Sequence, residues 1–153
     1  MANVYKKVYF HVVFAVKNRG VLLHKSWRSN LFAYMSGVLR QRGHFPLAVN
    51  GHLDHVHLLF DYSLKELPSD LVRELKKAST AYIKNNNLCP FNFQWQSGYG
   101  LFSVGWKEKD QMINYIKNQD RHHSKHSFKA EYLSLLNLYD IEFQNEYIFE
   151  FFD

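Results

Sequence analysis

The sequence predicts an α+β domain of the ferredoxin-like type: a split β-α-β sandwich with an antiparallel sheet, helices on one face and an additional tyrosine-bearing helix. Three observations support this fold class. The expected elements follow one another as strand, helix, strand, strand, helix and strand. The spacing of apolar residues switches between the two-residue period of strands and the longer period of helices. The 13 Phe, 10 Tyr and 3 Trp among 153 residues can fill a core without an intrachain disulfide, which the single cysteine excludes.

The first half of the chain supplies three strands and one helix. The apolar side chains at even positions from 8 to 16 share one face, and His11 lies on the other, as expected of a strand. Ser26 can cap a helix that Gly43 ends. The dipeptide Asn50-Gly51 predicts a hairpin turn. The expected strands are residues 4–16, 45–49 and 55–62, and the expected helix is residues 26–43.

The second half of the chain is expected to be mainly helical. Pro68 opens an amphipathic helix that runs to about Asn85, because proline is tolerated in the first helical turn. Two short strands flank a Gly-containing turn, and two further helices follow them. We expect one catalytic domain over residues 1–153, on which the acidic, aromatic tail of residues 131–153 packs. The expected elements are strands at residues 91–96 and 101–104, helices at residues 107–122 and 128–138, and extended chain from residue 141.

Basic residues are concentrated in the first 130 residues. All 19 Lys and Arg lie there with eight Asp and Glu, a net charge of +11, whereas residues 131–153 hold six acidic side chains. A body this basic favours a polyanionic partner, and nucleic acid is the usual one. The alternative is a solvated basic surface.

The N-terminal segment resembles a short signal sequence, because Lys6-Lys7 precedes an apolar stretch. That stretch contains His11 and ends at Lys17 instead of a small-residue cleavage site, so we expect no signal peptide. No stretch approaches the roughly 20 apolar residues of a membrane span. The expected location is the cytoplasm, without a membrane partner.

The tripeptide His55-Val56-His57 carries the first chemical signal. Residues i and i+2 of a strand point to one face, so the two imidazoles lie about 7 Å apart at the backbone and can converge on one ion. Imidazole combined with oxygen ligands suits a divalent metal, including one that assists phosphate chemistry. The alternative is that both side chains are half-buried strand histidines without a ligand.

The second signal is Tyr115 followed by Gln119 in the expected helix of residues 107–122. The two side chains lie one above the other at i and i+4 spacing. A tyrosine one turn from a carboxamide can present a phenolate nucleophile beside a neutral oxygen ligand. The alternative is that Tyr115 is an amphipathic packing residue.

Taken in order, five segments resemble the signature segments of the single-tyrosine HUH transposases. Enzymes of this family move minimal bacterial insertion sequences as single-stranded DNA. The resemblance extends from about residue 5 to 123, and the ordered set is more specific than any one piece. The segments are Tyr9–Arg19, Asp54–Leu59, Leu75-Lys76 with Ser79, Trp95–Val104 and Tyr115–Gln119.

The resemblance implies a metal-dependent enzyme that cleaves and rejoins single-stranded DNA. His55 and His57 would hold a divalent ion, Mg or Mn, with Gln119 completing the protein ligands. Tyr115 would attack the scissile phosphate and form a 5′-phosphotyrosine. Further implied features are a DNA hairpin at the element ends and a bacterial homodimer. In that dimer, the tyrosine helix can complete the partner's histidine site, so Tyr115 and Gln119 can come from the chain opposite His55 and His57; the sequence leaves cis or trans assembly open.

Other residues are weaker candidates. His122 and His126 have the i, i+4 spacing of zinc ligands but lack a further motif partner, so phosphate contact by a basic helix end is preferred. His11 is a candidate accessory residue on the histidine face. The expected DNA contacts are Arg73, Lys76, Lys77, Arg121, His122 and His123.

Two alternative functions stay open at this point. One is a non-catalytic nucleic-acid-binding protein of ferredoxin-like fold, which uses its sheet as a stacking platform. The other is the same nicking chemistry in another role: a replication initiator, a relaxase or a domesticated, repeat-associated transposase.

Overall fold

A four-stranded antiparallel sheet lies at the centre of the computed structural model, which describes residues 3–152. The strands are β1 (Tyr9–Ala15), β2 (Phe45–Gly51), β3 (His55–Asp61) and β4 (Gly100–Val104), in the order β2-β3-β1-β4. The first and third strands are therefore neighbours, as the split β-α-β motif requires. Their register pairs Val13 with His57 and Ala15 with His55.

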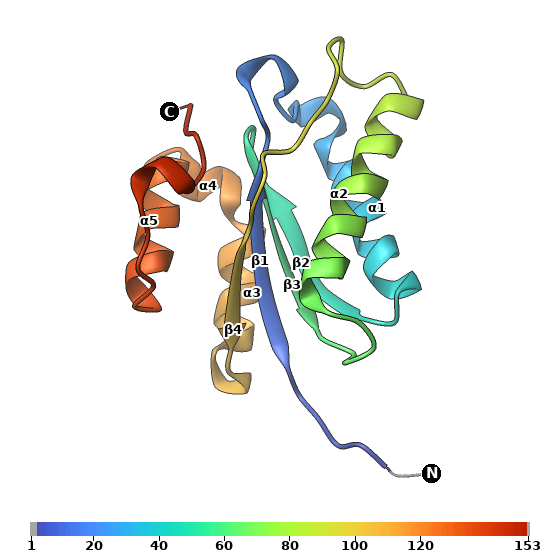
Figure 1. Cartoon of the computed structure of the whole chain (residues 1–153), viewed down its shortest axis with the longest axis vertical. Helices are drawn as coiled ribbons and strands as arrows, with labels where there is room; N and C mark the ends of the chain where they lie inside the picture. Colours follow the sequence, from blue (N-terminus) through green and yellow to red (C-terminus); the bar gives the residue numbers. More distant parts are fainter. Residues whose placement is uncertain (1–2, 153) are drawn as a thin grey trace.

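Two long helices cover one face of the sheet. They are α1 (Lys25–Gln41) and α2 (Pro68–Asn85), which pack on each other and run along the same side of the strands (Figure 1). Alternation along β1 and β3 turns their large apolar side chains toward these helices. The core on this face includes Val12, Phe14, Val56, Leu58 and Phe60, all fully buried.

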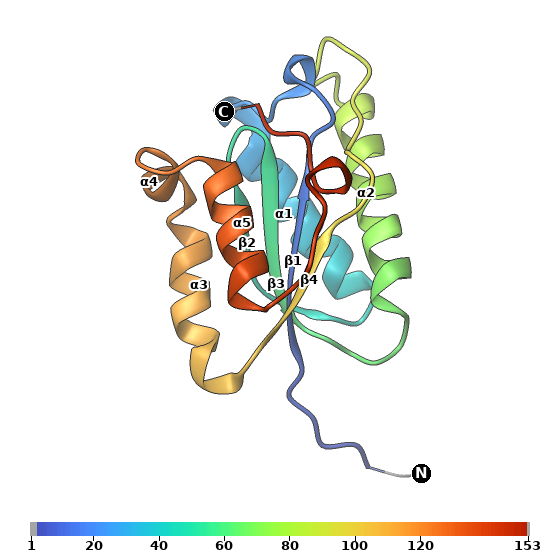
Figure 2. The ribbon, with the colours of Figure 1, turned by 60° about the vertical axis from the view of Figure 1, so that its left-hand side comes forward.

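Three shorter helices lie on the opposite face. They are α3 (Lys109–Lys117), α4 (Gln119–His123) and α5 (Phe128–Leu138) (Figure 2). Helix α3 contacts β2 and β3, and Ile116 joins Leu59 and Ala48 in a small second apolar cluster. Single turns of 3-10 helix occur at Arg19–Val21, Trp106–Glu108 and Asn145–Tyr147. The fold class is as expected, an α+β sandwich with a separate tyrosine-bearing helix, α3.

The expected single helix over residues 107–122 is in fact broken at Asn118, which has φ −101° and ψ 29°. A long-range contact explains the break. The Asn50 side chain donates to the carbonyls of Ile116 at 3.0 Å and Lys117 at 3.2 Å, so these groups are satisfied without a continuing helix. Gln119 consequently starts a new short helix, α4.

The expected hairpin turn at Asn50-Gly51 lies further along the chain. Gly51 is the last residue of β2, and His52 closes the turn by donating its backbone N–H to the His55 carbonyl. A Cβ on Gly51 would lie 2.1 Å from that carbonyl oxygen, so the hairpin needs glycine for this close approach.

The prediction of a strand over residues 91–96 is wrong. The segment forms only an isolated bridge between Trp95 and Val16. Trp95 turns inward instead, where its indole N–H donates to Ser79 at 2.9 Å and its ring packs edge-on against Phe14. This anchoring holds the segment against the end of β1 without a ladder.

The C-terminal residues run back along the body. Phe149 is buried against Phe128 and Tyr132, and the Gln96 side chain exchanges two hydrogen bonds with the Glu150 backbone. Within residues 3–152, no helix has the length and apolar character needed to cross a membrane.

Candidate active site

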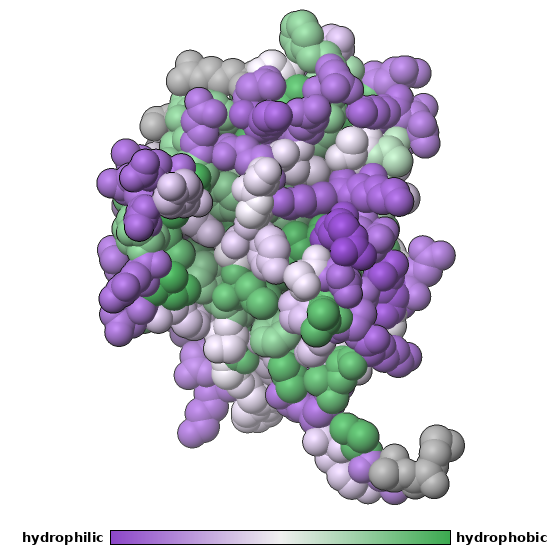
Figure 3. Space-filling view, in the orientation of Figure 1, coloured by the Kyte–Doolittle hydropathy of each residue, from purple (hydrophilic) through white to green (hydrophobic). Residues whose placement is uncertain are grey.

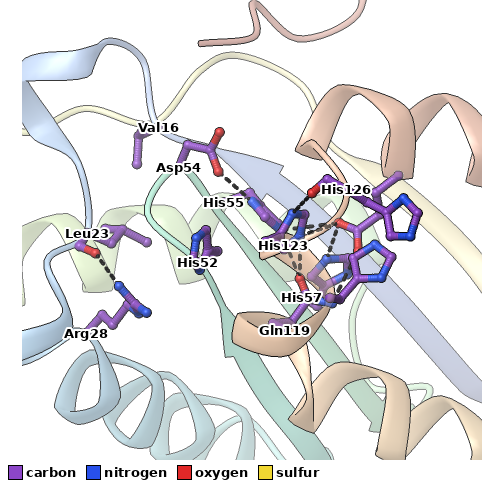
Figure 4. Close-up of polar contacts among 12 residues, drawn as sticks. Val16, Leu23, Arg28, His52, Asp54, His55, His57, Gln119, His123 and His126 are labelled. Carbon is purple, nitrogen blue, oxygen red and sulfur yellow. Dashed lines mark hydrogen bonds and ion pairs between the residues drawn. The ribbon is translucent and has the colours of Figure 1, made fainter. Parts of the chain in front are cut away.

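His55 and His57 project from β3 toward the face covered by α3, α4 and α5. Both side chains are fully buried, and Val56 between them points into the opposite core, as strand alternation predicts. Their side-chain contacts include Gln119, Glu131 and Phe128, while Val13 and Ala15 lie beside them on β1. Figure 4 shows His57, Gln119 and His123 converging with His55 between β3 and α4. The two imidazoles therefore belong to a buried polar cluster.

Glu131, on α5, lies at the centre of this cluster. Its side chain is 1% exposed, and its Oε1 atom lies 2.9 Å from the Nε2 atom of His57 and 3.2 Å from the Nε2 atom of His55. Sequence reasoning missed this residue because it was counted with the acidic tail. A signal existed: Glu131 interrupts the buried face that α5 builds from Phe128, Tyr132 and Leu135. A carboxylate within such a face needs polar partners.

Asp54 orients His55. The Asp54 carboxylate accepts the Nδ1–H of His55 at 2.7 Å, so the Nε2 atom of that ring faces the cluster. Burial would lower the pKa of His55, but hydrogen bonds to Asp54 and Glu131 outweigh it and raise the pKa to about 9. In the metal-free protein His55 is therefore an imidazolium at neutral pH.

His11 contacts His57 on the shared face. The His11 Nε2 and His57 Nδ1 atoms are 2.7 Å apart, and the two rings stack with centroids 5.0 Å apart. Burial and the neighbouring His57 lower the pKa of His11 well below its usual value, so it is neutral. The His11 Nδ1 atom is buried without a hydrogen-bond partner among the described residues. His11 thus has a geometry suited to setting the tautomer of His57.

Tyr115 and Gln119 reach the same cluster. The Gln119 Oε1 atom accepts from His55 Nε2 at 3.0 Å, and its Nε2 atom donates to Glu131 at 3.2 Å. The Tyr115 hydroxyl donates to the same oxygen of Glu131 as the Gln119 amide, Oε2. Burial and the Glu131 carboxylate raise the pKa of Tyr115, so the phenol is protonated at neutral pH.

These contacts lie within one chain. The resemblance allows Tyr115 and Gln119 to come from the chain opposite the histidine pair. In this structure, the sheet register and the break at Asn118 bring all four side chains together within one chain, and the Tyr115 and His57 ring centroids are 6.1 Å apart. One chain can therefore assemble the site in cis.

Helix α4 is held in place by an ion pair with α1. Arg28, whose side chain is 8% exposed, contacts the Asp120 carboxylate at 2.7 Å and the Leu23 carbonyl at 3.2 Å. His52 also binds Asp120, at 3.0 Å. Because Asp120 follows Gln119 directly, these contacts fix the start of α4 over the cluster.

A cleft of about 740 Å³ opens between α3 and α5 beside the cluster. Tyr115, Glu131 and His122 line its polar end, and Met112 and Leu138 contribute apolar walls. A ligand in this cleft would lie against the Tyr115 side chain.

The expected DNA contacts separate into two groups. Arg73, Lys76 and Lys77 lie on α2, across the sheet from the cluster, where hydrophilic side chains gather (Figure 3). Arg73 is exposed but paired with Asp70 at 3.0 Å, and Lys77 is exposed. Lys76 instead donates to the carbonyls of residues 96 and 98, at 2.9 and 2.7 Å. These hydrogen bonds hold the turn, and burial lowers the pKa of Lys76 to about 8.

The second group lies on α4. Arg121 is exposed, whereas His122 and His123 turn toward Glu131, with Nε2 atoms 3.4 and 3.3 Å from its carboxylate. Helix α4 thus directs both histidines toward the cluster, and His122 also lines the cleft. His126 stacks on His122 and is exposed.

Two groups of side chains within residues 3–152 have metal-ligand spacing. One is His55, His57 and Glu131, and the other is His122, His123 and Glu131; within each, the ligand atoms are at most 4.8 Å apart. The first group is fully buried and has the carboxamide oxygen of Gln119 beside it. Two imidazoles with carboxylate and amide oxygens form a mixed donor set that fits a divalent cation such as Mn²⁺ or Mg²⁺.

Comparisons with known proteins agree with this architecture. A family model described as IS200-like transposase matches residues 4–119. A candidate transposase from Deinococcus radiodurans R1 has a similar structure, with a TM-score of 0.60 at 23% identity over 78% of this chain and 95% of that chain. A REP-associated tyrosine transposase bound to a REP hairpin has a TM-score of 0.59 at 20% identity, over 80% of this chain and 73% of that chain. At such identities these structures show the fold alone. No curated protein matches the sequence.

Proposed function

Because the chain belongs to the IS200-like transposase family, we propose that it cleaves and rejoins single-stranded DNA at insertion-sequence ends through a 5′-phosphotyrosine on Tyr115. One observation carries the proposal. The Tyr115 hydroxyl, the His55/His57 pair and Gln119 meet in one buried cluster at the polar end of an open cleft. A nucleic-acid-binding protein that does no chemistry has no use for a buried tyrosine beside a metal-ligand set, so this arrangement disfavours the non-catalytic alternative.

Tyr115 is the proposed nucleophile. Its phenolic oxygen forms a bond to phosphorus while the bond from phosphorus to the 3′-oxygen breaks, and the phenolic proton is ultimately transferred to that 3′-oxygen. The phosphate ester stays on the 5′ side of the break, so rejoining needs no separate energy source. The hydrogen bond to Glu131 holds the phenolic oxygen at the mouth of the cleft, which favours a reactive geometry.

His55, His57 and Gln119 are the proposed protein ligands of a divalent ion, Mg or Mn. When bound, such an ion polarises the scissile phosphate and neutralises the charge that develops on it. Asp54 keeps the Nε2 atom of His55 directed at this position. His57 would carry its remaining proton on Nδ1 and donate it in a hydrogen bond to His11. The Nε2 lone pair of His57 is then free to bind the ion.

The proposed substrate is single-stranded DNA with a hairpin, recognised on the basic part of the protein in the bacterial cytoplasm. The exposed Arg73, Lys77 and Arg121 are the proposed phosphate contacts. The similar structure that is bound to a REP hairpin supports a hairpin ligand. We also propose a homodimer, in which each chain keeps a complete site of its own.

A second candidate function is that of a domesticated, repeat-associated transposase. The cis-assembled site favours it, because a single chain then holds every group that cleavage needs. Such an enzyme would perform the same chemistry on chromosomal repeat hairpins instead of mobile-element ends.

The test is incubation of the protein with labelled single-stranded DNA and Mg²⁺ or Mn²⁺. The DNA would be taken from both flanks of the gene. A covalent protein–DNA adduct that survives denaturing electrophoresis is expected for the wild type and not for Tyr115→Phe. The Phe variant should still bind the DNA within a few-fold of wild type. Cleavage by Tyr115→Phe at the wild-type rate would reject Tyr115 as the nucleophile.

A further inference from the structure

We propose that Glu131 is an anionic ligand of the divalent ion at the His55/His57 pair, alongside Gln119, so that helix α5 forms part of the metal site. The inference rests on the proposed function in one respect, namely that the histidine pair binds an ion. Residue 131 lies beyond the residues 4–119 that match the family model. The assignment therefore comes from the geometry of this chain.

The spacing of the ligand atoms carries the argument. Neighbouring ligands of an octahedral ion, each about 2.1 Å from the metal, lie about 3 Å apart. The Glu131 Oε1 atom is 2.9 Å from His57 Nε2 and 3.2 Å from His55 Nε2. The Gln119 oxygen is 3.0 Å from His55 Nε2. These three separations match neighbouring positions around one ion, and the His55, His57 and Glu131 ligand atoms all lie within 4.8 Å of one another.

The charge of the carboxylate supports the same conclusion. A carboxylate that is 1% exposed needs positive charge or strong hydrogen bonds nearby. Among the described residues, the ion-pair partners of Glu131 are all histidines, without a Lys or Arg. A divalent cation between these ligand atoms would place positive charge directly beside the buried carboxylate.

The second oxygen of Glu131 has a separate role. Oε2 accepts the Tyr115 hydroxyl and the Gln119 amide, while Oε1 faces the histidines. One carboxylate thereby holds the nucleophile next to the ion. Glu131 is accordingly a metal ligand through one oxygen and a positioning residue for Tyr115 through the other.

Isothermal titration with Mn²⁺ tests the ligand assignment. Glu131→Gln keeps the shape of the side chain and removes its charge, so Mn²⁺ affinity should fall about tenfold or more. Asp110→Asn removes one carboxylate whose side chain is 86% exposed and serves as the charge-matched control. The Mn²⁺ affinity of Asp110→Asn should stay within twofold of wild type. A His57→Ala variant should lose the site.

The outcomes separate the two claims. If Glu131→Gln binds Mn²⁺ like wild type while His57→Ala does not, Glu131 is not a ligand and the proposed metal site stands. If His57→Ala also binds like wild type, the metal site itself is wrong. If Glu131→Gln and Asp110→Asn lose the same Mn²⁺ affinity, the loss reflects net charge alone, and the assignment of Glu131 as a ligand is wrong.

Hydrogen exchange on the wild-type protein gives an independent readout, which holds even if Glu131→Gln does not fold. Ligation through Glu131 ties α5 to β3, so Mn²⁺ should slow amide exchange over residues 128–138 as well as over β3. Protection confined to β3 and α4 would contradict the proposal.

Discussion

Replacing Asp54 by Ala removes the hydrogen-bond acceptor that orients His55 and keeps His55, the proposed metal ligand, in place. Asp54 accepts the Nδ1–H of His55 at 2.7 Å, and its side chain is 11% exposed. Without this acceptor, the one proton that neutral His55 retains can lie on Nε2, where it blocks ligation. Loss of such an orienting partner typically weakens metal binding 10- to 100-fold. We therefore expect Mn²⁺ affinity to fall by about 1.4–2.7 kcal/mol.

Titration calorimetry with Mn²⁺ measures this loss, and thermal unfolding in EDTA shows whether the variant is folded. Asp54→Asn is the matched control, because its amide oxygen can still accept the Nδ1–H, so it should lose less affinity than Asp54→Ala. The Asp54 backbone carbonyl, which accepts from Val16 at 2.9 Å, is retained in both variants. Wild-type affinity in a folded Asp54→Ala protein would refute the orienting role of Asp54.

Three further predictions follow from the same contacts. Mixed His57→Ala and Tyr115→Phe proteins should stay inactive in DNA cleavage after demonstrated subunit exchange, because each site is built in cis; recovered cleavage would restore the trans arrangement. Gly51→Ala should lower stability by about 2–4 kcal/mol in urea unfolding, since its Cβ would clash with the His55 carbonyl 2.1 Å away; an unchanged midpoint would contradict the hairpin geometry. In EDTA, the pKa of His55 is about 9 in the folded protein and 6.5 in the unfolded chain. Protonated His55 therefore contributes fully to the free energy of unfolding below pH 6.5, and this contribution is lost as the pH rises through 9. The stability difference between wild type and His55→Asn should narrow over that range, and a constant difference would argue against the imidazolium.

Local patterns in the sequence were enough to predict the fold class and the direction of the histidine pair. Alternation along β3 fixed the face that His55 and His57 share, and the family resemblance is confirmed by the matching family model. Helix α2 begins at Pro68 and ends at Asn85, as its apolar period predicted. Signals of this kind need only neighbouring residues.

Long-range contacts account for what the sequence did not predict. The break at Asn118 depends on Asn50, 66 residues before Ile116 in the chain. The carbonyl groups that bind the Lys76 ammonium lie 20 residues or more away in the chain, so the sequence around Lys76 did not reveal these contacts. Glu131 meets His57 across 74 residues, so its charge was assigned to the acidic tail instead of the site. No local period carries information about these pairs.

The central claim is that Tyr115 becomes covalently linked to DNA, and peptide mapping of the adduct tests it most directly. The protein would be reacted with labelled single-stranded DNA and Mn²⁺, digested with nuclease and protease, and analysed by mass spectrometry. Our account predicts a nucleotide 5′-phosphate on the peptide that contains Tyr115, with fragment ions placing it on that tyrosine. An adduct on another tyrosine, or cleaved DNA with free 5′-phosphate ends and no adduct, would contradict it.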